Sequence, residues 1–290
     1  MLKIILTLLI FIFSSKSISS EEPQKKNDDI RRFVFSLSAM NTTSVDDAHG
    51  ISRVLVDQIK QRYKRVDKTE VLICKDSKEI LEKSKNGFDL MILSPNEFLT
   101  LRKQLPLHPM YVSSNDGTPG FKYLLIVNKS DSIINIEQLA GSDLLIYGRE
   151  RQQTPELILD HLLRVKKLPK KESFFRSINV DPVIAKVVLP VFFKKSKAAI
   201  VTEESFKLIS EINPQLDKEL RVIFKSPNYI FAVACLNLQT KDPELRKIFL
   251  DILGNLHTEP FGRQLLDLFR VEKLIPYKEE YLTEYMKLYD

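Results

Sequence analysis

The stretch FDLMILSP at residues 88–95 decides the fold class of this 290-residue chain. Its apolar run predicts a strand, which Ser94 and Pro95 end. Working outward, residues 33–37 and 70–74 read as two earlier strands, and Ile51, Leu55 and Ile59 recur at helical spacing between them. Another helix starts at residue 98. Strands that alternate with helices predict an α/β unit with a parallel sheet.

A second unit of similar size follows the turn signal NDGTPG at residues 115–120. Its predicted strands are residues 121–127, 143–147, 173–178 and 197–201. Its predicted helices are residues 136–139, 157–165 and 182–193. Two more strands are predicted at residues 221–224 and 230–236, and the remainder reads as helical, including an amphipathic segment at residues 277–289.

The N-terminus has the order of a secretory signal peptide: Lys3, an apolar run at residues 4–13, then several serines. We predict a signal peptide at residues 1–19, which is too short for a comfortable membrane span of about 20 residues. An uncleaved anchor is the alternative. No cysteine lies near it, which excludes a lipoprotein anchor. The polar residues 20–31 predict a disordered tether.

Composition narrows the function. The formal net charge is +6, but basic and acidic residues are interleaved, as expected of solvated helix faces rather than a nucleic-acid surface. A mildly basic surface still attracts anions. Cys74 and Cys235 both lie in apolar runs. Export permits a disulfide between them, and two buried thiols are the alternative.

Several short motifs follow one another in an informative order. They are DLMILSP at residues 89–95, GFKY at 120–123, NKS at 128–130, LAG at 139–141, YG at 147–148 and LRVIFKSP at 220–227. In this order and spacing the chain resembles the phosphate/phosphonate-binding family of ABC-importer solute receptors, over roughly residues 32–288. The resemblance implies an α/β, two-lobed periplasmic-binding-protein fold, whose two parallel or mixed sheets are joined by two hinge strands, residues 121–127 and 230–236. Lobe one would be residues 32–124 and 232–290, and lobe two residues 125–231.

The binding site is expected where loops leave the carboxyl ends of the strands, because ligands of open α/β sheets bind there and helix N-termini attract anions. Four loops qualify: residues 36–41, 94–97, 147–154 and 202–205. The candidate ligand-binding residues are Ser38, Asn41, Ser94, Tyr123, Tyr147, Arg149, Arg151, Thr154, Asp181 and Glu203. Tyr111 and Tyr229 lie near the predicted hinges and are further candidates for lining the cleft.

Each candidate also has a purely structural interpretation. The two arginines supply planar, permanently charged donors for oxyanions, or they are solvated loop residues. Ser38, Asn41 and Ser94 donate hydrogen bonds to a ligand or only cap helices, and Thr154 is predicted as an N-cap. Glu203 favours a helix N-terminus or holds a ligand amine.

The chain departs from the family pattern at two places in lobe two. A Ser/Thr-rich run at a helix N-terminus is replaced by QQTP at residues 152–155, where only Thr154 keeps a hydroxyl and Pro155 lacks an N–H. Val180 stands where the family commonly has a histidine, before the retained Asp181. The resemblance therefore implies the fold more firmly than it implies phosphonate as the ligand.

We predict a periplasmic solute-binding protein that captures a small, phosphate- or phosphonate-like anion for an ABC importer. Its partners would be that anion and the inner-membrane permease, and it would act as a monomer without cofactor, metal or nucleic acid. A sensor or interaction domain of the same fold is the alternative. Catalysis is not expected, because the four histidines are scattered and neither HExxH nor GxSxG occurs.

Overall fold

The computed structural model describes residues 30–40, 44–62, 68–115, 117–149, 151–240, 242–268 and 271–290. The predicted signal peptide at residues 1–19 and the candidate ligand residue Asn41 lie outside this part of the chain. The first strand begins at Ile30, so the last two residues of the expected tether, Ile30 and Arg31, belong to the sheet.

A seven-stranded mixed sheet forms the larger lobe, called lobe one here. Its order is β12-β4-β11-β3-β1-β2, and β5 pairs with β4. The strands are β1 (Ile30–Ser36), β2 (Lys68–Cys74), β3 (Leu90–Leu93), β4 (Leu107–Asn115), β5 (Thr118–Pro119), β11 (Val233–Asn237) and β12 (Lys273–Pro276). β1 runs parallel to β2 and β3, whereas β11 is antiparallel to both of its neighbours.

Helices cover this sheet and connect its strands. They are α1 (Val45–Arg62), α2 (Ser77–Lys83), α3 (Pro95–Leu101), α9 (Pro243–Gly254), α10 (Pro260–Leu268) and α11 (Glu280–Met286). Short 3₁₀ turns add η2 (Leu37–Ala39), η3 (Ser84–Asn86) and η6 (Leu256–Thr258). None of the described helices of the chain is both long and apolar enough to span a membrane.

A five-stranded mixed sheet, in the order β10-β6-β9-β7-β8, forms lobe two. Its strands are β6 (Tyr123–Asn128), β7 (Asp143–Tyr147), β8 (Ser177–Asp181), β9 (Ala198–Thr202) and β10 (Leu220–Lys225). Its helices are η4 (Lys129–Asp131), η5 (Ile136–Leu139), α4 (Thr154–Val165), α5 (Lys171–Phe174), α6 (Ile184–Phe192), α7 (Glu203–Ile212) and α8 (Gln215–Glu219). β7 is parallel to β8 and β9, and β6 is antiparallel to β9 and β10.

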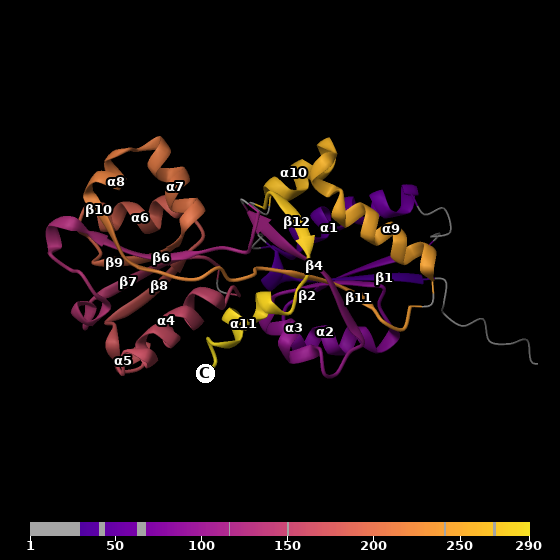
Figure 1. The fold of residues 1–290 in the computed structure, drawn as a ribbon, viewed down its shortest axis with the longest axis horizontal. Helices are drawn as coiled ribbons and strands as arrows, with labels where there is room; N and C mark the ends of the chain where they lie inside the picture. Colours follow the sequence, from indigo (N-terminus) through magenta and orange to yellow (C-terminus); the bar gives the residue numbers. More distant parts are fainter. Residues whose placement is uncertain are drawn as a thin grey trace, which may run out of the picture.

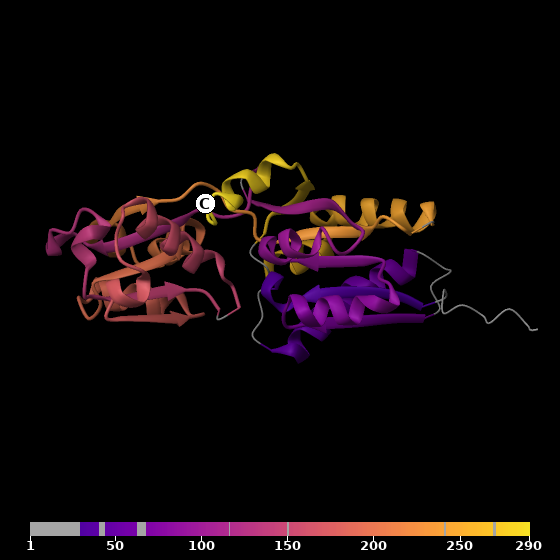
Figure 2. The ribbon, with the colours of Figure 1, turned by 90° about the horizontal axis from the view of Figure 1, so that it is seen from below.

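The two lobes lie side by side and the chain passes between them twice (Figure 1). The passages, residues 120–122 and 226–232, are called the crossing segments here. Phe121 and Tyr229 join them by two backbone hydrogen bonds of 2.9 Å. In Figure 2 these segments run along one edge of the molecule, and α11 lies at the same edge. β6 pairs only within lobe two and β11 only within lobe one. The crossing segments therefore precede most of the predicted hinge strands, residues 121–127 and 230–236, and neither crossing lies within a strand of either sheet.

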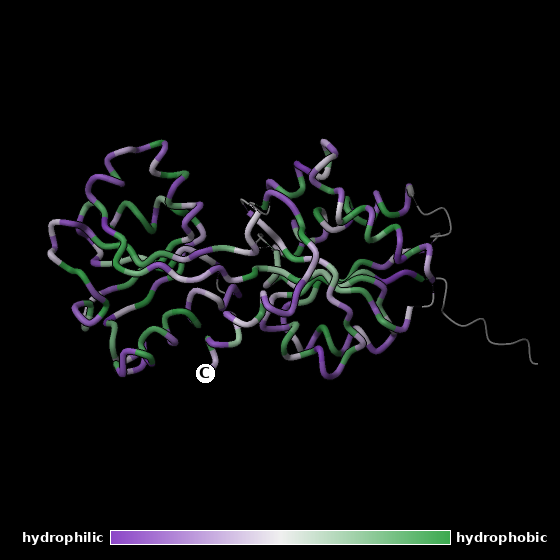
Figure 3. The backbone as a smooth tube through the Cα atoms, viewed as in Figure 1, coloured by the Kyte–Doolittle hydropathy of each residue, from purple (hydrophilic) through white to green (hydrophobic). Residues whose placement is uncertain are grey.

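Each lobe has an apolar interior because its strands are buried by helices (Figure 3). All six residues of β6 are buried, and Phe33 on β1 packs edge-on against Phe249 on α9 with ring centroids 5.8 Å apart. Burial of this surface is the main favourable term for folding. The α/β two-lobed architecture predicted from the sequence is confirmed.

Two sequence predictions of elements were wrong. Residues 173–178 are not one strand: the stretch is divided between the end of α5 and the start of β8. The region after residue 236 is not wholly helical, because β12 pairs with β4, which was itself missed. β4 contains Pro109 and β12 ends at Pro276, residues that local propensity places outside strands.

The two cysteines are free and buried. Cys74 lies on β2 and Cys235 on β11, with β1 and β3 between them. Three strand spacings amount to about 14 Å, beyond the roughly 7 Å between Cα atoms that a disulfide spans. Burial also raises the pKa of the Cys74 thiol to about 12. Both therefore act as small apolar core residues.

Candidate functional site

A cavity of about 180 Å³ lies where the two lobes meet. Lobe one contributes residues at the starts of α2 and α3, and lobe two contributes the segment that opens α4. The lining residues are Ser38, Lys75, Asp76, Ser77, Ser94, Pro95, Asn96, Glu97, Tyr123, Arg151, Gln152, Gln153, Thr154, Phe231 and Tyr285. Phe231 comes from a crossing segment and Tyr285 from α11. Polar groups from distant parts of the chain thus converge on one space between the lobes.

The lobe-one wall is built around the buried carboxylate of Glu97. Ser36 Oγ donates to one of its oxygens at 2.7 Å, and the backbone N–H and Oγ of Ser94 donate to the other at 2.9 and 2.8 Å. Glu97 N in turn donates to Ser94 Oγ at 3.3 Å, completing a capping box at the start of α3. Ser94 therefore caps the helix and also lines the cavity.

The lobe-two wall is the start of α4. Gln153 occupies the N-cap position and makes no side-chain cap. Thr154 is the first helical residue of α4. The prediction that Thr154 is the N-cap is therefore wrong, because an N-cap at Thr154 would require the helix to begin at Pro155. Its buried hydroxyl lies 3.4 Å from the hydroxyl of Tyr285. Asn96 Nδ2 donates to Gln153 Oε1 at 2.6 Å, which links the two walls directly.

A second hollow of about 50 Å³ lies beside the first, toward lobe two. It shares Tyr123, Gln152 and Phe231 with the larger cavity. Its other lining residues are Phe121, Tyr147, Gly148, Arg149, Pro155, Thr202, Glu204 and Ser205. Thr202 Oγ1 accepts from Ser205 N at 3.2 Å and so caps α7.

Most of the candidate residues lie at these two hollows. The larger cavity brings together Ser38, Ser94, Tyr123, Arg151 and Thr154, and the smaller one brings together Tyr123, Tyr147 and Arg149. Two candidates line neither hollow. Asp181 Oδ1 accepts from Val183 N at 2.8 Å in the loop before α6, and Glu203 pairs with Lys225 and, at 3.9 Å, with Lys122.

Comparison with known protein families identifies the chain. The family model described as "ABC transporter, phosphonate, periplasmic substrate-binding protein" matches residues 41–282. The chain belongs to this family. The predicted solute-binding class is confirmed, and the family implies a periplasmic location and an ABC-transporter partner. A comparison with curated proteins found no match.

Solved structures support the fold. The Xanthomonas citri protein XAC2383, bound to ATP, is 14% identical with a TM-score of 0.64, and the alignment covers 90% of this chain and 95% of that one. PhnD1 from Prochlorococcus marinus, in complex with methylphosphonate, is 13% identical with a TM-score of 0.62, covering 90% and 97%. A binding protein component of an ABC phosphonate transporter from Pseudomonas aeruginosa is 16% identical with a TM-score of 0.61, covering 90% and 85%.

Three parts of the chain that line the larger cavity were not predicted from the sequence. The loop Lys75 to Ser77 directly follows β2, so the rule that ligands sit beyond strand ends would have found it. Phe231 lies in a crossing segment, inside an apolar run that reads as core. Tyr285 is 131 positions from Thr154 in the sequence, so no local sequence pattern could predict that the two residues are in contact.

The two tyrosines named beside the candidates lie elsewhere. Tyr111 OH donates to the Leu250 carbonyl at 3.1 Å within lobe one. Tyr229 is buried behind the cavity, where its ring packs edge-on against Tyr285 with centroids 6.2 Å apart. Burial raises the pKa of the Tyr229 hydroxyl to about 12. Tyr229 therefore supports the wall from behind.

The charges around the larger cavity are mixed. Lys75 and Arg151 are cationic and exposed, whereas Asp76 and Glu97 are acidic and already accept hydrogen bonds from the protein. The positive groups are therefore the ones available to a solute. Among the described residues, no group of three His, Cys, Asp or Glu side chains is placed to hold a metal ion.

Proposed function

We propose that this chain captures a small oxyanion in the cavity between its lobes and presents it to an ABC permease. One observation carries the proposal: residues from both lobes line a single polar cavity, and the side chain that faces it from lobe two with a permanent positive charge is Arg151. The start of the twelve-residue helix α4 adds its dipole there. A ligand that contacts both lobes stabilises the closed form by its greater affinity for that form.

The ligands of the structural neighbours support an anion of this kind. PhnD1 is in complex with methylphosphonate, and XAC2383 is bound to ATP in one structure and to a chloride ion in another. At the lobe-two wall, Gln152 and Gln153 supply amides where the family has hydroxyls. Arg151 supplies charge there. This donor set suits a phosphate, phosphonate or sulfonate group.

The remaining sequence predictions complete the proposal. The direct ligand contacts would be Ser38, Ser94, Arg151 and Thr154, with Tyr147 and Arg149 in the adjoining hollow. In place of the bounds expected from the sequence, residues 32–124 and 232–290 for lobe one and 125–231 for lobe two, we propose bounds that follow the strand ends. These are residues 30–119 and 233–290 for lobe one and residues 123–225 for lobe two. We also propose that residues 1–19 direct export, and that the mature protein is a monomer that catalyses no reaction and binds no nucleic acid.

Thermal unfolding of the mature protein tests the anion site. The compounds would be phosphate, phosphite, methylphosphonate, sulfate, methanesulfonate and acetate. A ligand that binds only the folded protein stabilises it by about 2.7 kcal/mol at a hundredfold excess over its Kd. We expect at least one oxyanion to raise the Tm, and Arg151→Ala to abolish the rise.

The matched control is Arg53→Ala, which removes an exposed arginine on α1 outside the cavity. It should leave the ligand-induced rise intact. No rise with any oxyanion would contradict the proposal and favour the sensor or interaction domain. A rise that survives Arg151→Ala would place the anion elsewhere.

A further inference from the structure

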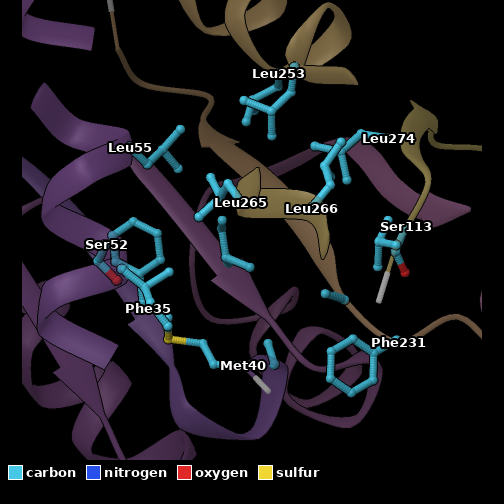
Figure 4. A pocket seen from close by; sticks show the side chains of 16 residues that line it. Phe35, Met40, Ser52, Leu55, Ser113, Phe231, Leu253, Leu265, Leu266 and Leu274 are labelled. Carbon is cyan, nitrogen blue, oxygen red and sulfur yellow. The ribbon is translucent and has the colours of Figure 1, made fainter. Parts of the chain in front are cut away.

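Lobe one contains a second cavity of a different character, with a volume of about 80 Å³ (Figure 4). Leucine side chains from α1, α9, α10 and β12 surround it, including Leu55, Leu253, Leu265 and Leu274. Every lining residue except Ser52 and Ser113 is apolar. An apolar lining of this kind repels ions and favours alkyl or aromatic groups.

The two serines show that the wall is not an ordinary packed core. Ser52 is 1% exposed and Ser113 is 3% exposed. Neither hydroxyl has a hydrogen-bond partner among the described residues. Buried hydroxyls nearly always have a partner, and leaving one without it is costly. The cavity wall is therefore less completely satisfied than a packed core, although an alkyl group inside it would make no hydrogen bond to either serine.

The apolar cavity adjoins the polar cavity between the lobes. Phe231 lines the apolar cavity and both of the inter-lobe hollows. The turn at η2 contributes to both cavities through different residues: Ser38 lines the polar cavity, and Ala39 and Met40 line the apolar one. The Phe231 side chain thus contacts both cavities, and one short turn contributes residues to each of them.

We propose, on the basis of the anion-binding function above, that the ligand is an amphiphilic anion: its charged head binds between the lobes and its short apolar tail passes Phe231 into the cavity of lobe one. Phe231 lies on a crossing segment, so a movement of one lobe relative to the other would shift its side chain. An apolar cavity of about 150 Å³ holds benzene, so 80 Å³ accommodates about three carbons.

Isothermal titration with a series of n-alkylphosphonates, from methyl to hexyl, tests this ligand class. The matching n-alkylsulfonates and n-alkanoates would be measured alongside. Each methylene that enters the cavity should raise the affinity about fourfold. The gain should level off after about three such methylenes, for a total of about 60-fold over the methyl compound.

Two substitutions at Leu265, on α10, should move that plateau in opposite directions. Leu265→Phe fills the cavity and should remove the gain from longer tails, whereas Leu265→Ala enlarges it and should extend the gain to longer chains. Both should leave the affinity for the methyl compound unchanged, because Leu265 does not line the polar cavity. If one variant does not fold, the wild-type series still shows whether affinity depends on chain length, and the other variant tests whether the tail lies in this cavity.

The outcomes separate the two proposals. If the methyl compound binds and the affinity does not depend on chain length, the apolar-tail inference is wrong and the anion site stands. If the gain with chain length is identical in both Leu265 variants, the tail lies elsewhere and the inference is again wrong. If no member of any series binds, the anion site is wrong and the inference falls with it.

Discussion

Ser94 and Arg151 line the same cavity but differ in what else they do. The Ser94 hydroxyl already holds the capping box with Glu97, so replacing it would disturb α3 as well as any ligand contact. Arg151 is exposed in the segment before α4. Substitution of Arg151 therefore reports on binding, whereas substitution of Ser94 reports on binding and stability together.

Asp143, at the start of β7, carries a pH dependence that can be measured. Its carboxylate accepts from Arg176 Nε at 2.8 Å, from Arg176 Nη2, and from Ser177 Oγ at 2.7 Å. The Arg176 hydrogen bond, with that of Ser177, lowers its pKa from 3.8 to about 2. A pKa below the unfolded value means that the stabilisation is present above about pH 4 and is lost as the pH falls toward 2.

We therefore expect Asp143→Asn to lower the free energy of unfolding at neutral pH and to have a diminishing effect in acid. Urea unfolding of both proteins between pH 6 and pH 2 measures the difference. The gap between wild type and variant should narrow between about pH 4 and pH 2. A gap that stays constant over this range would show that the ionised Asp143 pair contributes nothing.

At the level of elements, the crossing segments depend on Gly120. Its φ is +71°, and a Cβ built on it would lie 1.9 Å from the Tyr229 carbonyl oxygen. The Gly120 N–H donates to the Ser113 carbonyl at 2.9 Å. Glycine is required here both for the backbone conformation and for the close approach of the other crossing segment.

Gly120→Ala should destabilise the protein by more than the roughly 1–3 kcal/mol that a strained φ alone costs, because the Tyr229 backbone must also move. Gly141→Ala is the matched control, since Gly141 has the same φ of +71° and a Cβ added there would meet no atom within 4 Å. Urea unfolding of the two variants separates the clash from the strain. Equal destabilisation would mean that the crossing segments tolerate the added methyl group.

At the scale of the whole molecule, the C-terminal segment ties the lobes together across the crossing edge. Tyr289 OH donates to Asn96 Oδ1 of lobe one at 2.7 Å, and Arg164 Nη2 of lobe two donates to the Leu288 carbonyl at 3.1 Å. Tyr285 of the same segment is buried and packs against Tyr229 of a crossing segment. The separation of the lobes is therefore set partly by a segment that follows the last strand.

Removing the hydrogen bond from Arg164 to the C-terminal segment should allow the two lobes to move apart without unfolding either lobe. We expect Arg164→Ala to increase the ligand-free radius of gyration in small-angle X-ray scattering, with little change in Tm. Arg176→Ala is the control, because its bonds to Asp143 stay within lobe two. An unchanged radius in Arg164→Ala would assign the lobe separation to the crossing segments alone.

The sequence was enough to predict the elements whose pattern is local. Residues 143–147 read as a strand and form β7 with those bounds, and residues 157–165 read as a helix and lie within α4. Continuous apolar runs between turn signals identify buried strands whatever their partners. The order of weak motifs added the two-lobed fold, and the loops at strand ends included Ser38, Ser94 and Arg151.

Only the tertiary structure decided the features that depend on residues far apart. β4 and β12 are strands because they pair with each other and β4 also pairs with β11, although each contains a proline. Tyr285 lines the polar cavity because α11 returns to the edge along which the crossing segments run. Phe231, which lies on a crossing segment, lines both the polar and the apolar cavity. The sequence by itself determined the buried strands, because a buried strand is a continuous apolar run that can be recognised without its partners. It did not determine which distant segments pair or which residues line a common cavity, because those features are stabilised by contacts between segments far apart in the chain.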